Sequence, residues 1–218
     1  MSDATNTDEL FTQIRTAHRF LAAYYQRLLP TIEQIATQLE LDFYFWLPQK
    51  FDRPSQLTTN PFNKWQWDML PALSTYYTFK KVEDINKLRL GEYLITFWVI
   101  SDTGVNNNEM NDVQIDALSL KERPEDSESI IKIGIFTPNE EQDTNWYRNI
   151  WSQCPHPQYV EINEEPIVTK DADGYPIVSG GFQVPITKLM TDDGIKQIIN
   201  KTQTLRDQAL LFAKEVAV

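Results

Sequence analysis

The sequence has little cysteine, glycine and histidine, and each shortage argues against a class of protein. Cys154 is the one cysteine among 218 residues, so no disulfide can form within the chain and the fold must depend on packing. With 7 glycines and no glycine-rich phosphate motif, a nucleotide-binding loop is not expected. A structural zinc site needs about four cysteine or histidine ligands. The chain has 2 histidines, so we predict neither a metal nor a cofactor.

Long hydrophobic runs are also missing. No stretch approaches the roughly 18 apolar residues that a membrane span requires. The N-terminus carries acidic side chains rather than the basic start of a signal peptide, and no apolar segment follows them. Together with the unpaired cysteine, these features predict a cytoplasmic protein that does not contact membranes.

Basic residues are outnumbered, and the excess of acid is concentrated in the middle of the chain. The net charge is −11, and segments 102–128 and 139–173 each hold eight acidic and two basic residues. An acidic surface repels phosphate backbones and attracts basic groups. We therefore expect no nucleic acid as a partner and instead a protein with a basic surface. Solubility is the alternative explanation for the same charge.

Apolar residues recur with a period near 3.6 from Leu10 to Leu39, which predicts a long amphipathic helix. Pro30 removes one helical hydrogen bond and clashes with the preceding turn, so a kink or a break is expected there. Without a break the helix would span roughly 45 Å, which is longer than a domain of this size covers. Part of it is therefore expected to project or to be covered by a second copy.

Segments typical of strands dominate the middle of the chain. The run 92–101 is apolar on both faces, which predicts a central strand, and 113–120 is expected to return beside it after a turn. The other expected strands are 42–47, 75–79, 129–136, 159–162, 167–170, 175–178 and 182–186, with a short helix after Thr137 and a final helix from Thr191.

This order of elements predicts an α+β fold. The expected architecture is a mostly antiparallel sheet, flanked by a long N-terminal helix that is kinked or broken at Pro30 and by a C-terminal helix. We expect a single domain over residues 1–218. The joint that the sequence defines least is 48–73, which is rich in Pro, Asn, Thr and Trp.

Two short motifs resemble parts of known sites. Asp102-Thr103-Gly104 resembles the catalytic triplet of aspartic proteases, but that chemistry needs two such aspartates and the sequence has one copy. We interpret the motif as a hairpin turn. Segment 171–174 resembles a fragment of a calcium loop, but its twelfth position is Phe182 instead of Glu, so a hairpin turn is expected there too.

Cys154 and His156 are the remaining candidates for chemistry. Two residues apart in a proline-rich turn, they have poor geometry for a catalytic dyad, and we interpret the segment as a helix terminator with a buried thiol. No nucleophile elbow and no singled-out pair of carboxylates is found. The sequence therefore leaves enzymatic activity uncertain and favours a protein without catalysis.

The best candidate contact surface combines aromatic and acidic residues. Trp, Tyr and Arg dominate binding hot spots, and segment 61–67 is aromatic, although its tryptophans could equally fasten the loop to the core. We predict a binding or regulatory protein, in concrete form an acidic inhibitor or immunity-like protein that covers a basic site on a partner. The predicted partner-binding residues are Trp65, Trp67, Asp112, Asp116, Glu122, Glu125 and Asp126.

Two alternatives stay open. One is an enzyme of unknown reaction whose site is assembled from scattered residues; a deep pocket with perturbed carboxylates or His156 would favour it. The other is a homo-oligomeric structural component that associates through the helix at 10–39, because that helix is too long and too apolar to be covered by one small domain.

Overall fold

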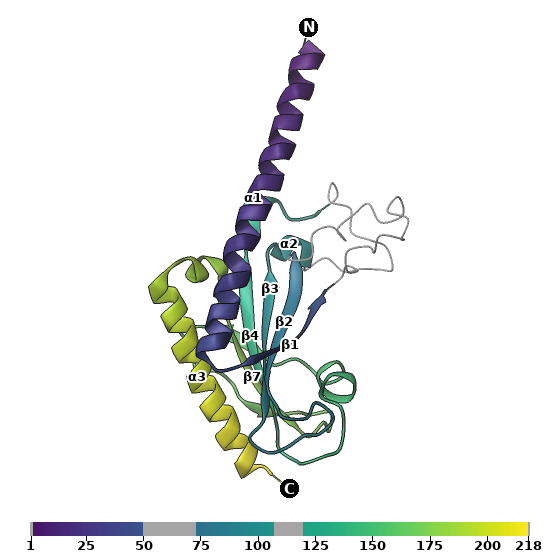
Figure 1. Cartoon of the computed structure of the whole chain (residues 1–218), viewed down its shortest axis with the longest axis vertical. Coiled ribbons are helices and arrows are strands. Elements are labelled where there is room, and N and C mark those ends of the chain that lie inside the picture. The colour runs from purple at the N-terminus through teal and green to yellow at the C-terminus, as the bar shows by residue number, and fades with distance from the viewer. Residues whose placement is uncertain (1, 50–72, 107–119, 218) are drawn as a thin grey trace.

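The computed structural model describes residues 2–49, 73–106 and 120–217 (Figure 1). Two long helices begin and end the described chain: α1 is Ser2–Gln38 and α3 is Asp192–Glu215. Thr191 caps α3, since its hydroxyl accepts a hydrogen bond from the amide of Gly194 at 3.2 Å. The predicted N-terminal and C-terminal helices are confirmed. The short helix expected after Thr137 begins only at Trp146, because Thr137 and Pro138 are the last residues of a β-strand. Within the described ranges, no helix is both long and apolar enough to cross a membrane.

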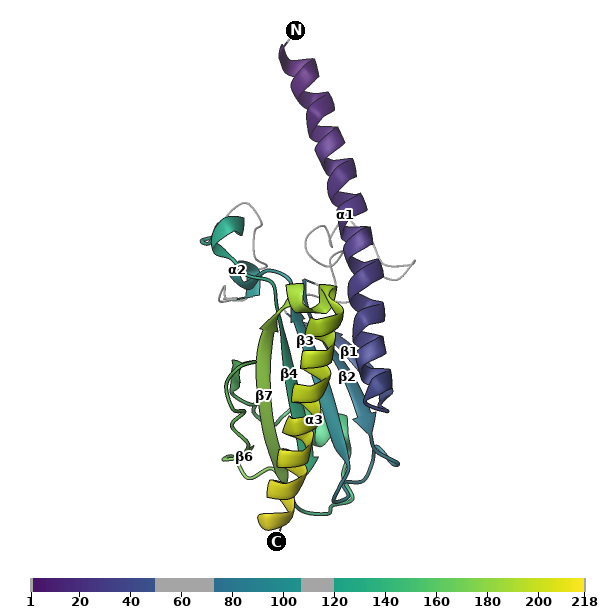
Figure 2. The same cartoon turned by 90° about the vertical axis from the view of Figure 1, so that its left-hand side faces the viewer.

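The break predicted at Pro30 is absent, because α1 continues through this residue as one helix (Figures 1 and 2). Proline has no amide hydrogen to donate, so one hydrogen bond of the helix is missing at this point. Leu28, Ile32 and Ile35, which flank Pro30, are at most 2% exposed. Tertiary packing of this face compensates for the lost hydrogen bond and keeps the helix continuous.

In the described part of the chain, seven strands form one sheet, with β3 near its centre. The strands are β1 Asp42–Pro48, β2 Ser74–Lys81, β3 Tyr93–Ile100, β4 Ile130–Pro138, β5 Tyr159–Glu161, β6 Thr169–Lys170 and β7 Ile177–Pro185. Their order is β1-β2-β3-β4-β7-β5, with β6 also paired to β7. All pairs are antiparallel except β5 with β7, which confirms the predicted α+β fold with a mostly antiparallel sheet.

The pairing predicted for segment 113–120 is wrong. Both edges of β3 are occupied, since β2 pairs with residues 93–100 and β4 pairs with residues 94–100. Segment 113–120 therefore cannot be the neighbour of β3; residues 113–119 lie outside the described residues, and Leu120 is not in a strand. A turn signal in the sequence is local, whereas the choice of a neighbouring strand depends on the whole sheet.

The two strands predicted at 175–178 and 182–186 are one strand, β7. Gly180 and Gly181, which lie between the two predicted strands, are paired residues of the sheet, with Gly181 opposite Gly134 of β4. A Cβ added at Gly181 would lie 2.7 Å from the ring of Tyr159, and one at Gly134 would lie 3.1 Å from its hydroxyl. These glycines therefore make room for the Tyr159 side chain against the sheet.

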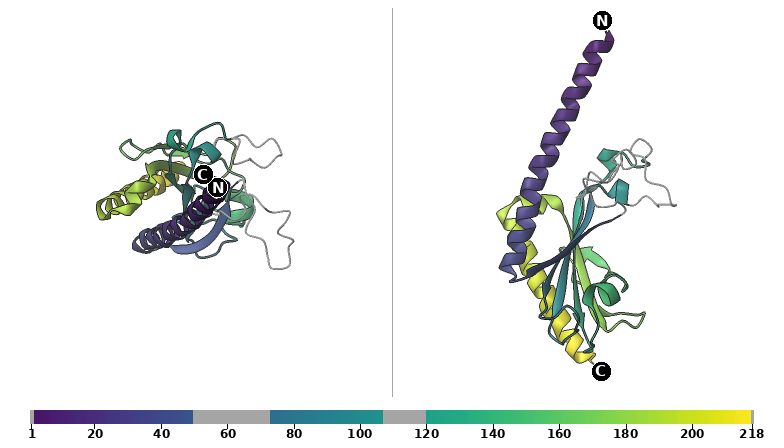
Figure 3. Two further views of the ribbon diagram at one scale, coloured as in Figure 1. Left: turned by 90° about the horizontal axis from the view of Figure 1, so that it is seen from above. Right: turned by 45° about the vertical axis from the view of Figure 1, so that its right-hand side comes forward.

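Each face of the sheet has its own hydrophobic core. The docked half of α1 and the whole of α3 cover one face, and η4, a π-helix at Trp146–Trp151, covers the other (Figure 3). β3 serves both cores, because Ile95, Phe97 and Val99 face the long helices and Leu94 faces η4. Burying each such side chain contributes about 2 kcal/mol.

Candidate functional site

One end of the sheet gathers most of the features that could bind a partner. We call it the α1 end, because α1 projects past it (Figures 1 and 2). β1 and β3 finish there and β2 and β4 start there. The amide of Gln49 donates to the carbonyl of Ser74 and that of Ser101 to the carbonyl of Leu73, both at 2.8 Å. The Tyr24 hydroxyl of α1 lies 2.9 Å from the Ser101 hydroxyl.

Ser74 joins the chain segments that meet at the α1 end. Its side chain is buried, and its hydroxyl accepts a hydrogen bond from Trp98 Nε1 at 3.1 Å and donates one to Asn106 Oδ1 at 3.0 Å. Residues 49 and 73 flank segment 50–72, and residues 106 and 120 flank segment 107–119. Ser74 follows residue 73 directly and is hydrogen-bonded to Asn106. It therefore holds the C-terminal flank of segment 50–72 against the N-terminal flank of segment 107–119.

The short helix α2, Thr103–Asn106, forms the surface of this end. Asp102 caps it, since its Oδ1 accepts hydrogen bonds from the amides of Gly104 at 2.9 Å and Val105 at 3.3 Å. The Asp102 carboxylate is thus hydrogen-bonded to backbone amides close to it in the chain, as expected for a turn residue. The turn is a short helix rather than the predicted hairpin turn. The amide of Glu128 donates to the Thr103 hydroxyl at 2.8 Å, which fastens the acidic segment to α2.

Glu122, Glu125 and Asp126 are exposed at the α1 end, in and beside η3, a single 3-10 turn at Pro124–Asp126. Arg123 pairs with Asp126, with Nε 2.9 Å from Oδ2, and partly neutralises it. Among the described residues, neither Glu122 nor Glu125 has an ion-pair partner. The other predicted partner-binding residues, Trp65, Trp67, Asp112 and Asp116, lie outside the described residues.

The projecting half of α1 extends past the same end of the sheet (Figures 1 and 2). Residues 9–23 are all exposed, and apolar side chains are among them: Leu10 is 52%, Phe11 53% and Phe20 71% exposed. The expectation that part of the helix projects is confirmed. Several exposed large apolar side chains along one helix are typical of an interaction surface.

A separate pocket of about 430 Å³ lies between β1 and η4. The described residues that line it are Tyr44, Phe45, Trp46, Leu47, Ile85, Asn86, Asn145, Tyr147 and Arg148. They include neither a histidine nor a carboxylate, so this pocket lacks the groups that would favour the enzyme alternative. This pocket was not predicted from the sequence, because β1 and η4 are about a hundred residues apart and no motif relates them.

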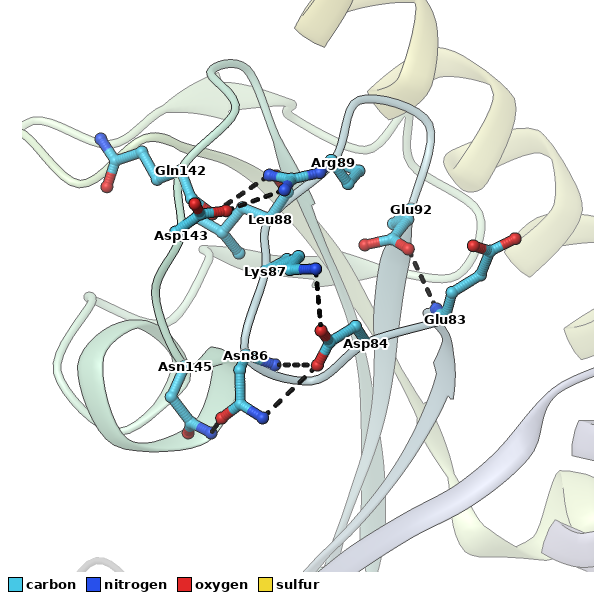
Figure 4. A network of polar contacts seen from close by, with 10 residues as sticks. All are labelled: Glu83, Asp84, Asn86, Lys87, Leu88, Arg89, Glu92, Gln142, Asp143 and Asn145. Atoms are coloured by element: carbon cyan, nitrogen blue, oxygen red, sulfur yellow. Dashed lines mark hydrogen bonds and ion pairs between the residues drawn. The ribbon is translucent and has the colours of Figure 1, made fainter.

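A polar network fixes the rim of this pocket (Figure 4). Asn145 Nδ2 donates to Asn86 Oδ1 at 2.9 Å, and Asn145 Oδ1 caps η4 by accepting from the amides of Tyr147 and Arg148. Arg89 pairs with Asp143 at 2.8 Å. Exposed ion pairs contribute less than about 1 kcal/mol, so the network positions the 82–92 loop rather than stabilising the fold greatly.

The network also perturbs one carboxyl group. The backbone amide of Asn86 donates to Asp84 Oδ1 at 3.0 Å, and this hydrogen bond, helped by Lys87, lowers the pKa of Asp84. The lowered pKa of Asp84 is therefore explained by hydrogen bonding within its own loop.

His156 lies in an aromatic cluster on the η4 face of the sheet. Its ring stacks on Tyr76 at 5.0 Å and meets the edge of Trp151 at 5.1 Å. Burial lowers the pKa of His156 to about 4, so the imidazole is neutral at pH 7. Lys132 Nζ lies 5.0 Å from the centre of the Trp98 ring, and burial lowers its pKa as well.

η4 ends at Trp151, and Cys154 lies in the turn that follows it, where its amide donates to the Ile150 carbonyl at 2.8 Å. The thiol is buried, as the sequence predicted, although the helix ends before the segment 154–157. Burial raises the pKa of the Cys154 thiol to about 12. A catalytic thiol needs a lowered pKa, because the thiolate is the nucleophile, so the environment of Cys154 opposes a dyad with His156.

The Cys154 thiol is expected to resist alkylation in the folded protein. At pH 7, a pKa of about 12 leaves roughly one thiol in 10⁵ ionised, and the side chain is 5% exposed. Iodoacetamide labelling, followed by mass spectrometry, should give no adduct in native buffer and one adduct in urea. Rapid labelling of the native protein would instead indicate an activated thiol and would support the enzyme alternative.

The described residues offer no metal site. Over the described ranges, no group of three or more His, Cys, Asp or Glu side chains could hold a metal ion. The segment that resembles a calcium loop is the turn between β6 and β7, with Asp171 Oδ1 accepting from the amide of Asp173 at 3.0 Å. Gly174 has a φ of 89°, which confirms the predicted hairpin turn with glycine in the left-handed region.

The fold and this surface define an α+β protein with one sheet, a projecting N-terminal helix and exposed acidic residues at the same end of the sheet. The chain belongs to the PM0109 family, whose model matches residues 4–210. One relative, the Uncharacterized protein PM0109 of Pasteurella multocida (strain Pm70), is 22% identical over 203 residues, which cover 90% of this chain and 92% of that protein. No solved structure matches the chain. Because the family match starts within α1, the projecting helix is part of the family's common sequence.

Proposed function

We propose that this protein is a non-catalytic binding or regulatory protein, an acidic inhibitor or immunity-like protein whose α1 end covers a basic site on a partner protein. One observation carries the proposal. The exposed acids Glu122 and Glu125 lie at the same end of the sheet as the flanks of segments 50–72 and 107–119, which contain the other predicted contact residues. A cytoplasmic location belongs to the proposal, because Cys154 is a buried free thiol.

The charge at the α1 end suits this role. Glu122 and Glu125 are solvent-exposed carboxylates without a described ion-pair partner, so their charge is available to a basic surface. Complementary charges accelerate association and select among partners more than they add affinity. Exposed charges are screened by salt over about 10 Å at 0.1 M ionic strength. Binding of this kind is therefore expected to weaken as salt is added.

Neutralising the acids at the α1 end should weaken partner binding at low salt by on the order of 10-fold. The variant is Glu122→Gln/Glu125→Gln/Asp126→Asn. The partner is first captured from the host lysate at low and high salt and identified by mass spectrometry, and affinities are then measured by calorimetry. A stoichiometric basic partner that is lost at high salt is the expected result.

The matched control removes three exposed carboxylates elsewhere: Glu141→Gln/Glu165→Gln/Asp173→Asn. It changes the net charge equally, so it should leave the affinity nearly unchanged if the α1 end is the contact. Equal losses for both variants would mean that only the net charge matters. No captured partner at either salt concentration would contradict the proposal.

A second candidate is a homo-oligomeric component that associates through α1. The apolar side chains on the projecting half of the helix favour this candidate specifically, because they are exposed in the part of the chain that the structure describes.

A further inference from the structure

Two irregular elements meet at the pocket between β1 and η4. The helix η4 is a π-helix, a rare form that is frequently found at functional sites. The strand β1 carries a β-bulge, because its pairing with β2 passes from Phe43 to Phe45 and leaves Tyr44 without a partner residue. Bulges are likewise common next to active sites, where they redirect a side chain. Tyr44 lines the pocket from β1, and Tyr147 and Arg148 line it from η4.

Hydrogen bonds fix the three walls of this pocket relative to one another. The Tyr44 hydroxyl is hydrogen-bonded to the backbone of Tyr147, which joins β1 to η4. The amide of Trp146 donates to the carbonyl of Ile85 at 2.9 Å, which joins η4 to the 82–92 loop, and the paired carboxamides at the rim connect the same two walls (Figure 4). A pocket that is already formed loses little conformational entropy when a ligand binds.

Aromatic and aliphatic side chains give the pocket an apolar lining. The ring of Phe45 meets the Tyr44 ring at 4.9 Å and the Tyr147 ring at 4.8 Å, both in edge-to-face geometry. Leu47 and Ile85 line the pocket as well, and all five residues are half-buried. The volume of about 430 Å³ falls within the range of roughly 300 to 1,000 Å³ that is usual for small-molecule sites. The lining therefore suits an aromatic ring.

Arg148 is the one charged residue among the described residues that line the pocket. The Asp84 carboxylate of the rim network pairs with Lys87 at 3.4 Å. The Asp143 carboxylate pairs with Arg89 at 2.8 Å. Arg148 itself has no ion-pair partner among the described residues. In a chain with a net charge of −11, the described lining thus offers one positive charge that is not neutralised.

We propose that this pocket binds a small aromatic carboxylate, with its ring against Phe45 and Tyr147 and its carboxylate on the guanidinium of Arg148. A guanidinium matches a carboxylate through two parallel hydrogen bonds. A phosphate is less suited, because the amides of Tyr147 and Arg148 at the start of η4 already donate to Asn145 Oδ1. The described lining has neither a histidine nor a carboxylate, so the pocket binds its ligand without transforming it.

Two probes with the same ring and opposite charge test the pocket: naphthoate, an anion, and naphthylmethylamine, a cation. Each is titrated into the full chain, with calorimetry for the affinity and amide chemical shifts for the location. Naphthoate should bind on the order of 10-fold more tightly than the amine, with shift changes in β1 and η4. Because the net charge is −11, non-specific attraction would favour the amine instead.

Replacing Arg148 tests its role. Arg148→Gln should weaken naphthoate binding on the order of 10-fold and leave binding of the amine unchanged, because only the charge-assisted hydrogen bonds are lost. Arg19→Gln is the matched control, since Arg19 is an exposed arginine of α1 and the change in net charge is the same. Ile85→Trp should fill the pocket and abolish binding of both probes. Circular dichroism melting verifies that each variant is folded.

Two outcomes would overturn the inference. Equal affinities for the two probes, or equal losses of naphthoate binding in Arg148→Gln and Arg19→Gln, would remove Arg148 as the carboxylate ligand. Shift changes away from β1 and η4, or no binding of naphthoate up to its solubility limit, would remove the pocket as the site. The inference goes beyond the proposed function and does not depend on it. Arg148→Gln should still bind the basic partner, and naphthoate binding stands even if no such partner is captured.

Discussion

Replacing Gly194 with alanine is expected to lower the free energy of unfolding by about 3 kcal/mol. Gly194 lies in the first turn of α3, directly after η5, a 3-10 helix at Ile186–Met190. A Cβ there would collide with the backbone carbonyl of Lys188 and lie 2.8 Å from the Thr191 hydroxyl. Backbone atoms cannot rotate away as side chains do, so the junction of η5 and α3 would have to shift and the Thr191 cap would weaken.

The direction of the stability change in Gly194→Ala distinguishes the steric clash from the effect of helix propensity. Glycine to alanine inside a helix normally stabilises it by about 1 kcal/mol, so helix propensity alone predicts the opposite result. Asn200→Ala is the control, because Asn200 is exposed on the same helix and its replacement should be neutral or slightly stabilising. Urea denaturation of the three proteins gives the comparison. A Gly194→Ala protein as stable as the wild type would show that η5 and α3 are not joined this tightly.

Lowering the pH from about 7 to about 4.5 should cost about 2 to 3 kcal/mol of stability through His156. Burial lowers the pKa of His156 to about 4 from its ordinary 6.5. Between these values the unfolded chain binds a proton that the folded protein does not. The stability that neutral His156 provides is therefore complete above about pH 6.5, falls as the pH drops, and levels off below about pH 4.

His156→Gln removes this titration and should flatten the dependence of the unfolding free energy on pH, even though the loss of ring stacking on Tyr76 lowers stability overall. His18 is the other histidine of the chain and is exposed on α1, so His18→Gln serves as the control. Carboxyl groups titrate alike in all three proteins. An equally steep pH dependence for His156→Gln and the wild type would contradict the burial of His156.

Local patterns were sufficient for the two long helices and for the mostly antiparallel character of the sheet. The cap at Thr191 and the apolar period of both helices are encoded within a few turns, and β3 is apolar on both faces because it contributes to two cores. Long-range packing decided the rest. Docking of Leu28 and Ile32 overrides the proline between them, and the Tyr159 ring, not a break in the strand, explains the glycine at 181.

The arrangement of the candidate site could not be predicted from the sequence. Glu122, Glu125 and Asp126 were identified by charge and are exposed, but their role in binding stays a prediction. Their position near α2 follows from hydrogen bonds such as the one from the Glu128 amide to Thr103, which no sequence spacing indicates. The pocket between β1 and η4 was missed for the same reason. Trp65, Trp67, Asp112 and Asp116 stay predictions.

The uninterrupted α1 has a mechanical consequence. The helix is clamped between Leu28 and Leu39, and Leu10 stands 18 residues away, or about 27 Å along the axis. A tilt of about 10° at the clamp would therefore sweep Leu10 through about 5 Å. Pro30 lies at the start of the clamp, where one backbone hydrogen bond is missing, so bending concentrates there. The projecting half of α1 thus acts as a lever that pivots near Pro30. A force applied near Leu10 would be magnified where α1 packs on the core.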